Sequence, residues 1–443
     1  MSAPARAVVI GGGFAGVASA VELSRRGWRV TLVEARRKAG GRATSFVDPE
    51  SGETIDNGQH LLMGCYTATR ELLHTLGTSH LVRFQKRLSI TMIEEGGRTT
   101  RLSCPPLPSP AHLLAGLLTF KGLTLADKAA LLRCAPRLMK ENGNGMTVEG
   151  WLDALGQTEN LRERFWRPLA VAALNEATAV AGAELLTGVL RVAFGQGASG
   201  SGLGFPRAGL SDLHAEPAAA WLGTHGGELL TGTAASGIDI AAGRASAVVL
   251  RDGTRLECDA VVLAVPHTAV AELLPSTFLD ADPKLARASD LGLSAIASVN
   301  IWYDRRVTEL GFFGQIGGTV QFVFNKSVLW DQSVAKGSYL ACVISAASGL
   351  KESTKEEIAQ AAVEELGRYI PATRAAKVLR TMVVREKQAT FSGRPDLLWL
   401  RPGSATALPN LALAGDWTDT GLPGTIEGAV RSGVAAAGVI TAT

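Results

Sequence analysis

The chain contains 443 residues, more than one ordinary domain usually holds, so two structural units are expected. Hydrophobic residues make up 46% of the sequence and charged residues 19%, which excludes a disordered or fibrous protein. Lys and Arg total 44 and Asp and Glu total 41, so the net charge of +3 does not suggest a nucleic-acid partner.

The cysteines and the long-range hydropathy exclude further classes. The five cysteines are scattered and lack C-x-x-C spacing, so we expect neither a disulfide framework nor a bound metal. The first strand-like run, Ala7–Ile10, follows the start so closely that no cleaved leader is expected. No run approaches about 20 apolar residues, the length of a membrane-spanning helix. These features predict a cytoplasmic protein.

Four continuous apolar runs predict strands of a parallel sheet that is covered on both faces. Between the first two runs, Gly16–Arg26 has the spacing of a helix, which predicts a βαβ unit at the N-terminus. The four runs are Ala7–Ile10, Val30–Val33, Ala260–Val265 and Leu411–Ala414.

The middle of the chain has a different pattern. The Leu-rich segment His112–Met139 predicts two helices, and a further helical block is expected over Trp151–Glu176. Later segments favour an antiparallel sheet with helices on one face. Its predicted strands are 295–304, 320–325, 339–345 and 378–385, with a helix over 351–368.

We therefore predict an α/β fold in which a Rossmann-like dinucleotide-binding domain carries an inserted α+β substrate domain. The dinucleotide-binding domain takes residues 1–75, 225–290 and 390–443. The substrate domain takes a helical part, 76–224, and an antiparallel sheet, 291–389.

The first strand leads into a G-x-G-x-x-G motif that opens a helix, and Glu34 follows eighteen positions after its last glycine. The first glycine allows a tight turn, the second a close approach to a pyrophosphate, and the third close helix packing. The helix N-terminus then faces the phosphates, and Glu34 can bind ribose hydroxyls. The predicted contacts are Gly11, Gly13, Phe14, Ala15, Gly16, Glu34 and Ala35.

The run from Glu34 to Ser45 resembles the E-x(5)-G-G-R-x-x-S signature of FAD enzymes in the amine oxidase and phytoene desaturase superfamily. The resemblance implies a glutathione reductase-like FAD domain, with Gly41 beside the diphosphate and Arg42 as its charge partner. A solvated surface arginine is the alternative for Arg42. The S-G-G-C-Y sequence of covalent flavin attachment is absent, so FAD is expected to bind non-covalently.

The C-terminal segment 410–429 resembles the closing flavin motif of the same superfamily. Its acidic residue can accept hydrogen bonds from the ribityl chain, and the helix that follows can stabilise negative charge on the flavin. Segments 227–235 and 260–266 resemble further parts of the FAD domain in that superfamily. The residues implied are Gly415, Asp416, Gly424, Thr425 and Ile426, together with Ala235 and Pro266.

The block Ile55–Tyr66 resembles the D-N-G-Q-H-x-x-x-G-C-Y block of squalene-associated FAD-dependent desaturases, also called hydroxysqualene dehydroxylases. Segments 165–176, 205–213 and 386–391 resemble the same family, with Gln388 where many members have Arg. The resemblance implies reductive loss of the hydroxyl of hydroxysqualene to give squalene and water, with NAD(P)H as reductant. It also implies a C30 isoprenoid substrate and association with other squalene or hopanoid enzymes.

The resemblance places the 55–66 block beside the flavin, where His60 is the candidate proton donor, although it can instead bond a neighbour. Asp56 is a second candidate, with anchoring of the loop as its alternative. Asn57 and Gln59 are candidate positioning groups, and Gly58 a cofactor contact. Asn175 and Glu176 can line the substrate pocket or cap a helix end, and Arg207 can approach the active site or lie at the surface. Cys65 and Tyr66 are expected to pack in the core.

Two questions stay open at this level. The Leu-rich stretch 112–139 has a basic polar side formed with Lys140, so it can either touch the inner face of a membrane or cover the substrate sheet. The alternative functions are an oxidative desaturase or amine oxidase of the same fold, and a flavin-binding carrier without turnover.

Overall fold

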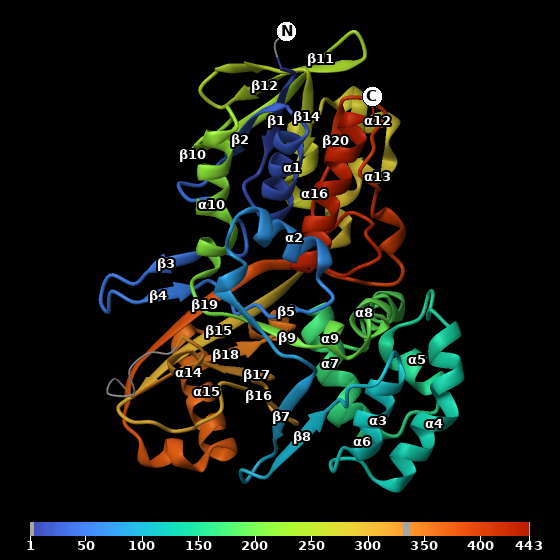
Figure 1. The fold of residues 1–443 in the computed structure, drawn as a ribbon, viewed down its shortest axis with the longest axis vertical. Coiled ribbons are helices and arrows are strands. Elements are labelled where there is room, and N and C mark those ends of the chain that lie inside the picture. Colours follow the sequence, from blue (N-terminus) through green and yellow to red (C-terminus); the bar gives the residue numbers. More distant parts are fainter. Residues whose placement is uncertain (1–3, 331–336, 443) are drawn as a thin grey trace.

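The structure is a computed structural model that describes residues 4–330 and 337–442. One end of the molecule is built on five parallel strands in the order β10-β2-β1-β14-β20 (Figure 1). The predicted parallel strands are therefore confirmed, and their continuous apolar runs are buried. The strands are β1 (Arg6–Ile10), β2 (Arg29–Glu34), β10 (Glu228–Thr231), β14 (Ala260–Leu263) and β20 (Leu411–Leu413).

Helices cover this sheet and share its core. The predicted βαβ unit is confirmed, since α1 (Phe14–Arg25) connects β1 to β2. It packs against α16 (Ile426–Thr441) so closely that a Cβ on Gly433 would lie 2.3 Å from the Ala15 carbonyl oxygen. The third helix, α10 (Leu210–Thr224), shares its buried leucines with the same core. The predicted substrate part, 76–224, therefore includes a helix, α10, that packs with the nucleotide-binding sheet.

The opposite end holds a seven-stranded sheet in the order β19-β15-β18-β17-β16-β7-β8. Its pairs are antiparallel except β16–β7, which is parallel. The strands predicted over 291–389 are confirmed, but the part 76–224 is not purely helical, because its β7 and β8 complete the sheet. The strands are β7 (Ser89–Ile93), β8 (Thr99–Ser103), β15 (Leu293–Tyr303), β16 (Phe312–Gln315), β17 (Phe322–Asn325), β18 (Ser338–Ile344) and β19 (Val378–Phe391).

The two faces of this sheet have different surroundings. One face packs against α15 (Lys355–Tyr369) through side chains such as Val299 and Leu340. The alternate residues of the same strands, such as Tyr339 and Val343, join the core shared with the helical lobe. We call this second side the inner face, because loops of the nucleotide-binding end also reach it.

The helical lobe flanks the seven-stranded sheet and occupies one lower side of the molecule (Figure 1). The two helices predicted in 112–139 and the helical block predicted over 151–176 are confirmed. No helix among the described residues has the length and hydropathy needed to cross a bilayer. The lobe contains α3 (Ala111–Thr119), α4 (Leu125–Lys140), α5 (Val148–Ala154), α6 (Glu159–Leu161), α7 (Arg167–Leu174), α8 (Ala183–Gly195) and α9 (Gly197–Gly200).

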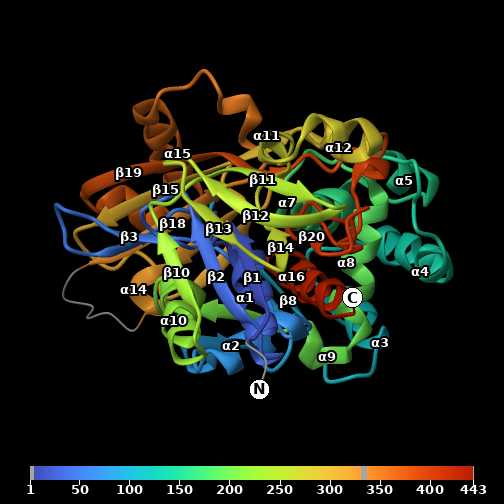
Figure 2. The same ribbon diagram turned by 90° about the horizontal axis from the view of Figure 1, so that it is seen from above.

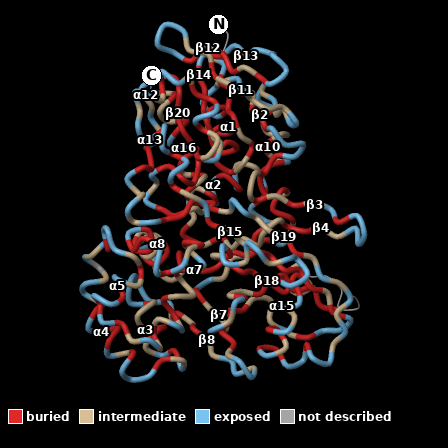
Figure 3. The backbone as a smooth tube through the Cα atoms, turned by 180° about the vertical axis from the view of Figure 1, so that it is seen from behind, coloured by how far each residue is buried: buried red, intermediate tan, exposed pale blue. Residues whose placement is uncertain are grey.

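Short elements join and cap the two ends. A three-stranded antiparallel sheet lies across the end that carries the N-terminus (Figure 2), and two small sheets lie near the junction. Burial follows this layout: β1, β2, β14 and β20 lie in the buried interior (Figure 3), whereas β10 is a partly exposed edge strand. These elements are β11 (Ala235–Ala241), β12 (Arg244–Leu250), β13 (Arg255–Glu257), β3 (Ser45–Val47), β4 (Thr54–Asp56), β5 (Leu62–Met63), β6 (Val82–Phe84), β9 (Leu203–Pro206), α2 (Thr67–Thr75), α11 (Val270–Leu273), α12 (Ser276–Ala281), α13 (Pro283–Ala286) and α14 (Lys326–Leu329).

Candidate cofactor and substrate site

The predicted cofactor residues come from three distant segments and meet at one edge of the parallel sheet. Gly11 directly follows β1, and Glu34 ends β2. Pro266 and Gly415 come shortly after β14 and β20. Carboxyl ends of parallel strands lie at the same edge, which is where dinucleotides bind in this architecture.

The glycines of the first motif have two different roles. Gly11 has φ +110°, and a Cβ there would lie 2.4 Å from the Ala264 carbonyl oxygen. A Cβ on Gly16 would lie 1.8 Å from the Gly11 carbonyl oxygen, so both glycines are required for packing. Gly13 is different, because the nearest atom to its added Cβ is the Gly41 Cα, 3.8 Å away. A Cβ on Gly41 would lie 3.1 Å from Gly13 Cα, so the two glycines pack against each other and together present backbone without side chains, a surface that suits a diphosphate.

The other residues of this loop are positioned by local packing. Glu34 is buried and accepts hydrogen bonds from the backbone N–H groups of Gly12 and Arg36, each at 2.8 Å. Its carboxylate retains further acceptor sites for ribose hydroxyls. The Phe14 ring stacks on His214 with centroids 3.7 Å apart, so Phe14 can serve the cofactor only through its backbone. Ala15 is buried in the first turn of α1, and Ala35 is exposed.

Arg42 is held inside the site and is not a solvated surface arginine. Its guanidinium donates to the Asp416 carboxylate at 2.5 Å and to the Ala389 carbonyl oxygen at 2.9 Å. Burial opposes the charged form, but the charge and hydrogen bond of Asp416 outweigh it and raise the pKa of Arg42. The two residues predicted beside the diphosphate and the ribityl chain therefore form one ion pair across the domain.

The C-terminal motif brings a second helix N-terminus to the site. Gly415 has φ +149° and packs against Trp417. The Thr425 hydroxyl accepts from the Gly428 N–H at 3.1 Å, which caps the start of α16 at the buried Ile426. A Cβ on Gly424 would lie 3.0 Å from Asp416 Oδ2. The outer predicted contacts, Pro266 and Ala235, are exposed and partly exposed.

Two buried charged residues support this motif, and the sequence analysis missed both. The Arg401 guanidinium donates to the carbonyl oxygens of Trp417 at 3.1 Å and Leu422 at 2.8 Å, which fixes the loop after β20. Glu427 is fully buried and accepts from the backbone N–H groups that open α2, at Ala68 and Thr69. Arg401 lies outside every motif, and Glu427 lies within segment 410–429 without any sign of its buried partners, so only the fold reveals their roles.

Asp56 and Asn57 have structural partners that favour the anchoring alternative over direct catalysis. Asp56 is 1% exposed and accepts from the Ser45 hydroxyl at 2.8 Å and the Leu210 N–H at 3.0 Å. Its second oxygen accepts from Lys326 Nζ at 2.7 Å. The Asn57 side chain accepts from the Thr44 N–H at 3.2 Å. These bonds fix the start of loop 57–60.

His60 lies in that loop with its ring partly buried. Its Nδ1 is 3.1 Å from the Gly58 carbonyl oxygen, which can only accept, so Nδ1 carries the hydrogen. Burial lowers the pKa of His60, although the Gly58 bond and the charge of Asp56 partly oppose this. Neutral His60 therefore presents Nε2 as an acceptor, and it must first take a proton there to act as the predicted acid.

The loop abuts the inner face of the seven-stranded sheet. A Cβ on Gly58 would lie 3.8 Å from the His60 ring and 4.0 Å from the Ser298 hydroxyl of β15. Ser298 Oγ and Gln59 Nε2 are buried without a hydrogen-bond partner. Gly58, Gln59 and His60 are thus brought together where the nucleotide-binding end meets the substrate sheet.

The remaining candidates have the structural roles given as their alternatives. Asn175 is the C-cap of α7, with φ +50°, and its side chain links this helix end to the Ala346 N–H at 2.8 Å. Glu176 accepts from the Ser392 hydroxyl at 2.7 Å. Burial raises the pKa of the Cys65 thiol to about 12, which fits packing, as does the core position of Tyr66. Arg207 is exposed.

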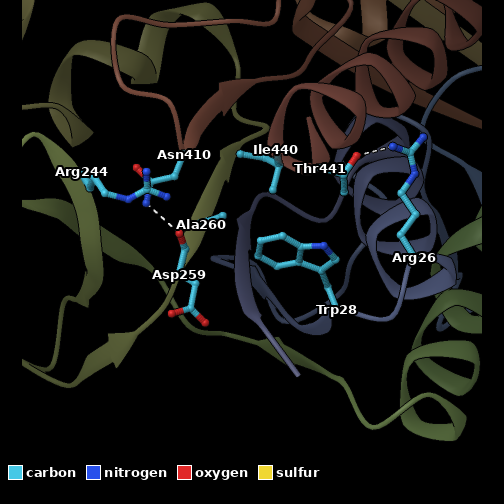
Figure 4. A pocket seen from close by; sticks show the side chains of 8 residues that line it. All are labelled: Arg26, Trp28, Arg244, Asp259, Ala260, Asn410, Ile440 and Thr441. Carbon is cyan, nitrogen blue, oxygen red and sulfur yellow. Dashed lines mark hydrogen bonds between the residues drawn. The ribbon is translucent and has the colours of Figure 1, made fainter. Parts of the chain in front are cut away.

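A separate pocket of about 370 Å³ lies at the opposite edge of the parallel sheet (Figure 4). Its lining includes Trp28, Asp259 and Asn410, which directly precede β2, β14 and β20. The pocket therefore lies at the amino ends of these strands, away from the candidate site at their carboxyl ends. The five cysteines are buried free thiols. No group of three or more His, Cys, Asp or Glu suited to a metal occurs within 4–330 and 337–442.

Solved structures share the fold at low sequence identity. An oxidoreductase from Methanosarcina mazei matches with a TM-score of 0.75 and 20% identity, covering 97% of this chain and 98% of that one. Putrescine oxidase matches with a TM-score of 0.73 and 15% identity over the full length of both chains. These likenesses confirm the predicted α/β fold.

Curated relatives are more similar in sequence. Hydroxysqualene dehydroxylase from Rhodopseudomonas palustris is 32% identical over 438 residues, and that from Sinorhizobium fredii is 30% identical over 450; 98% of each chain is covered. A 15-cis-phytoene desaturase from Glycine max is 26% identical, covering 97% of this chain and 78% of that one. The family model for flavin containing amine oxidoreductase matches residues 14–441. The chain belongs to this family of flavin-containing enzymes.

Proposed function

We propose that this chain is an FAD-dependent oxidoreductase that removes the hydroxyl of hydroxysqualene to give squalene in hopanoid and squalene biosynthesis. The observation that carries the proposal is end-to-end similarity to hydroxysqualene dehydroxylases, at 32% identity over 98% of both chains. The desaturase relatives are less similar, which makes a carotenoid-type desaturase the second candidate.

The inner face of the seven-stranded sheet suits a long hydrocarbon. Phe312 lies 4.9 Å from Phe324, 5.5 Å from Phe322 and 5.4 Å from Phe205 between ring centroids. Phe312 and Phe322 are only partly buried, so this aromatic cluster leaves apolar surface uncovered. Apolar contact of this kind can bind an isoprenoid chain. The hydroxyl is then the one polar group of the substrate that other residues must meet.

Loop 57–60 supplies polar groups where that apolar face ends. When bound, reduced flavin would supply the hydride that takes the place of the hydroxyl. The chain's own task is to protonate the departing oxygen and exclude bulk water, and His60 Nε2 is the group that can carry that proton. The allylic position of the hydroxyl favours its departure as water.

The residues at the parallel-sheet edge fit FAD. The side-chain-free backbone of Gly13 and Gly41 suits a diphosphate, and the first turns of α1 and α16 offer N–H groups that have no partner within the helix. The Arg42–Asp416 pair supplies a donor and an acceptor beside them. We propose non-covalent binding, with NAD(P)H as external reductant, a cytoplasmic location and contact with other squalene or hopanoid enzymes.

Product analysis tests this function. Purified holoenzyme with hydroxysqualene and NADPH should form squalene, which chromatography detects. Phytoene and a primary amine serve as counter-substrates under air or with a quinone. Conversion of either one, with hydroxysqualene left unchanged under reducing conditions, would overturn the proposal in favour of an oxidative enzyme.

A further inference from the structure

The helix α4 carries an apolar ridge that projects from the helical lobe. Leu125 is 85% exposed and Leu132 is 49% exposed, and Ala129 and Pro136 are exposed between and beyond them. The spacings of four, three and four residues place all four on one side of the helix. We call these four residues the α4 ridge. The helix lies at the outer edge of the lobe in Figures 1, 2 and 3.

The other side of α4 attaches the ridge firmly to the molecule. Leu131 and Cys134 are buried in the core that also contains Phe324 and Tyr339 of the inner sheet face. The helix begins with a capping box in which the Thr124 side chain accepts from the Asp127 N–H at 3.3 Å. The exposed leucines are therefore a fixed feature of a packed helix.

Cations flank the ridge on both sides. Arg133, Arg137 and Lys140 are exposed along one side, one helical position away from Leu132 and Pro136. Lys128 lies on the other side, and exposed Lys121 precedes the helix. The α4 ridge is therefore bordered by basic residues along its whole length.

Acidic groups do not cancel this charge. Asp127, the acidic residue of α4, is 1% exposed and turns inward, where it accepts from Asn160 Nδ2 at 2.6 Å and also from the Thr158 hydroxyl. Glu141, just beyond the helix, accepts from Arg137 Nε at 2.7 Å and offsets one cation. Four of the five flanking cations have no acidic partner among the described residues.

We propose that the α4 ridge docks the protein on an anionic lipid surface. An apolar stripe bordered by Lys and Arg is the pattern of helices that lie in the membrane interface, with leucines among the acyl chains and cations at the phosphates. Two exposed leucines give too little area for a stable protein dimer, and a symmetric contact would set these cations against themselves. The proposed function enters only in the purpose of docking, which would be to collect a water-insoluble substrate from the lipid.

Vesicle flotation tests the docking without any turnover. The holoenzyme should float with mixed phosphatidylglycerol–phosphatidylcholine vesicles and much less with phosphatidylcholine alone. The double variant Leu125→Gln, Leu132→Gln should reduce the bound fraction at least tenfold. Arg133→Gln should reduce partitioning about fivefold, and added salt should act the same way.

Leu379→Gln provides the matched control, since Leu379 is 57% exposed on β19. It should float like the unchanged protein. Equal flotation of the double variant and the control, or absence of wild-type binding to anionic vesicles, would overturn the proposal. A loss of self-association in the double variant without lipid would overturn it too, because the ridge would then serve a second copy. Vesicle binding without conversion of hydroxysqualene would contradict the proposed function alone.

Discussion

The cofactor edge and the substrate junction of this protein are built in different ways. At the cofactor edge, residues without side chains expose the backbone, as Gly13 and Gly41 do, and the key groups follow directly after strands. At the junction, a buried charge network does the positioning, centred on Asp56 and Lys326. Short sequence motifs indicate the first arrangement, whereas the second depends on contacts between distant segments of the chain.

The largest expected effect separates the two glycine roles. Gly16→Val should prevent folding, because its Cβ would lie 1.8 Å from a backbone oxygen. Gly13→Val should fold but lose FAD, because a side chain there would cover the bare backbone on which the diphosphate is expected to lie. Circular dichroism and the flavin absorbance of the purified protein measure the two outcomes. Full flavin content in Gly13→Val would contradict the placement of the diphosphate.

The junction can be tested through its buried ion pair. Lys326 is 3% exposed and also lies 4.0 Å from the Trp330 ring centroid. Lys326→Met leaves the Asp56 charge unpaired and should lower the free energy of unfolding by about 3–5 kcal/mol. The double variant Asp56→Asn, Lys326→Met should recover much of this in urea unfolding. Equal stability of the single variant and the wild type would show that the pair does not hold the loop.

His60 distinguishes chemistry from positioning within the junction. His60→Ala should keep FAD but lower kcat about 10²–10⁴-fold, the usual contribution of a general acid. Because burial lowers the pKa of His60, the acid form is lost as pH rises through a value below 6.5, so kcat/KM should fall toward alkaline pH. His60→Gln should flatten this limb of the profile. An unchanged profile would dismiss His60 as the proton donor.

A smaller effect concerns His214, which packs under Phe14 at the cofactor edge. Burial lowers the pKa of His214 to about 4, so the unfolded chain binds a proton that the folded chain excludes between about pH 6.5 and pH 4. Stability should fall as pH falls through this window, by up to about 1.4 kcal/mol per unit from this group. Thermal unfolding of His214→Phe should show a shallower decline, and a parallel curve would contradict this origin.

The local structure at the cofactor edge could be predicted from the sequence because its signals lie close together in the chain. Strand, glycine loop, helix and Glu34 occur within one βαβ unit, and each has a recognisable pattern. The pairing of Arg42 with Asp416 was not predicted, since 374 positions separate the two residues. The motifs predict a cofactor contact for each of the two residues separately.

The junction was less accessible to sequence reasoning. Lys326 lies 270 positions from Asp56, and a lone lysine after an apolar strand gives no signal of a buried partner. Likewise β7 and β8 join the seven-stranded sheet through β16, which lies more than 200 residues away along the chain. Such long-range pairing depends on tertiary packing, which overrides local patterns.

A single-turnover experiment separates hydroxyl removal from every other proposed reaction, because it needs no assumption about the physiological reductant. FAD in the purified protein is reduced chemically without air and then mixed with hydroxysqualene. Flavin absorbance should return as squalene appears in equal amount, whereas added squalene should cause no return. Flavin that stays reduced while the alcohol remains unconsumed would show that this protein does not remove the hydroxyl.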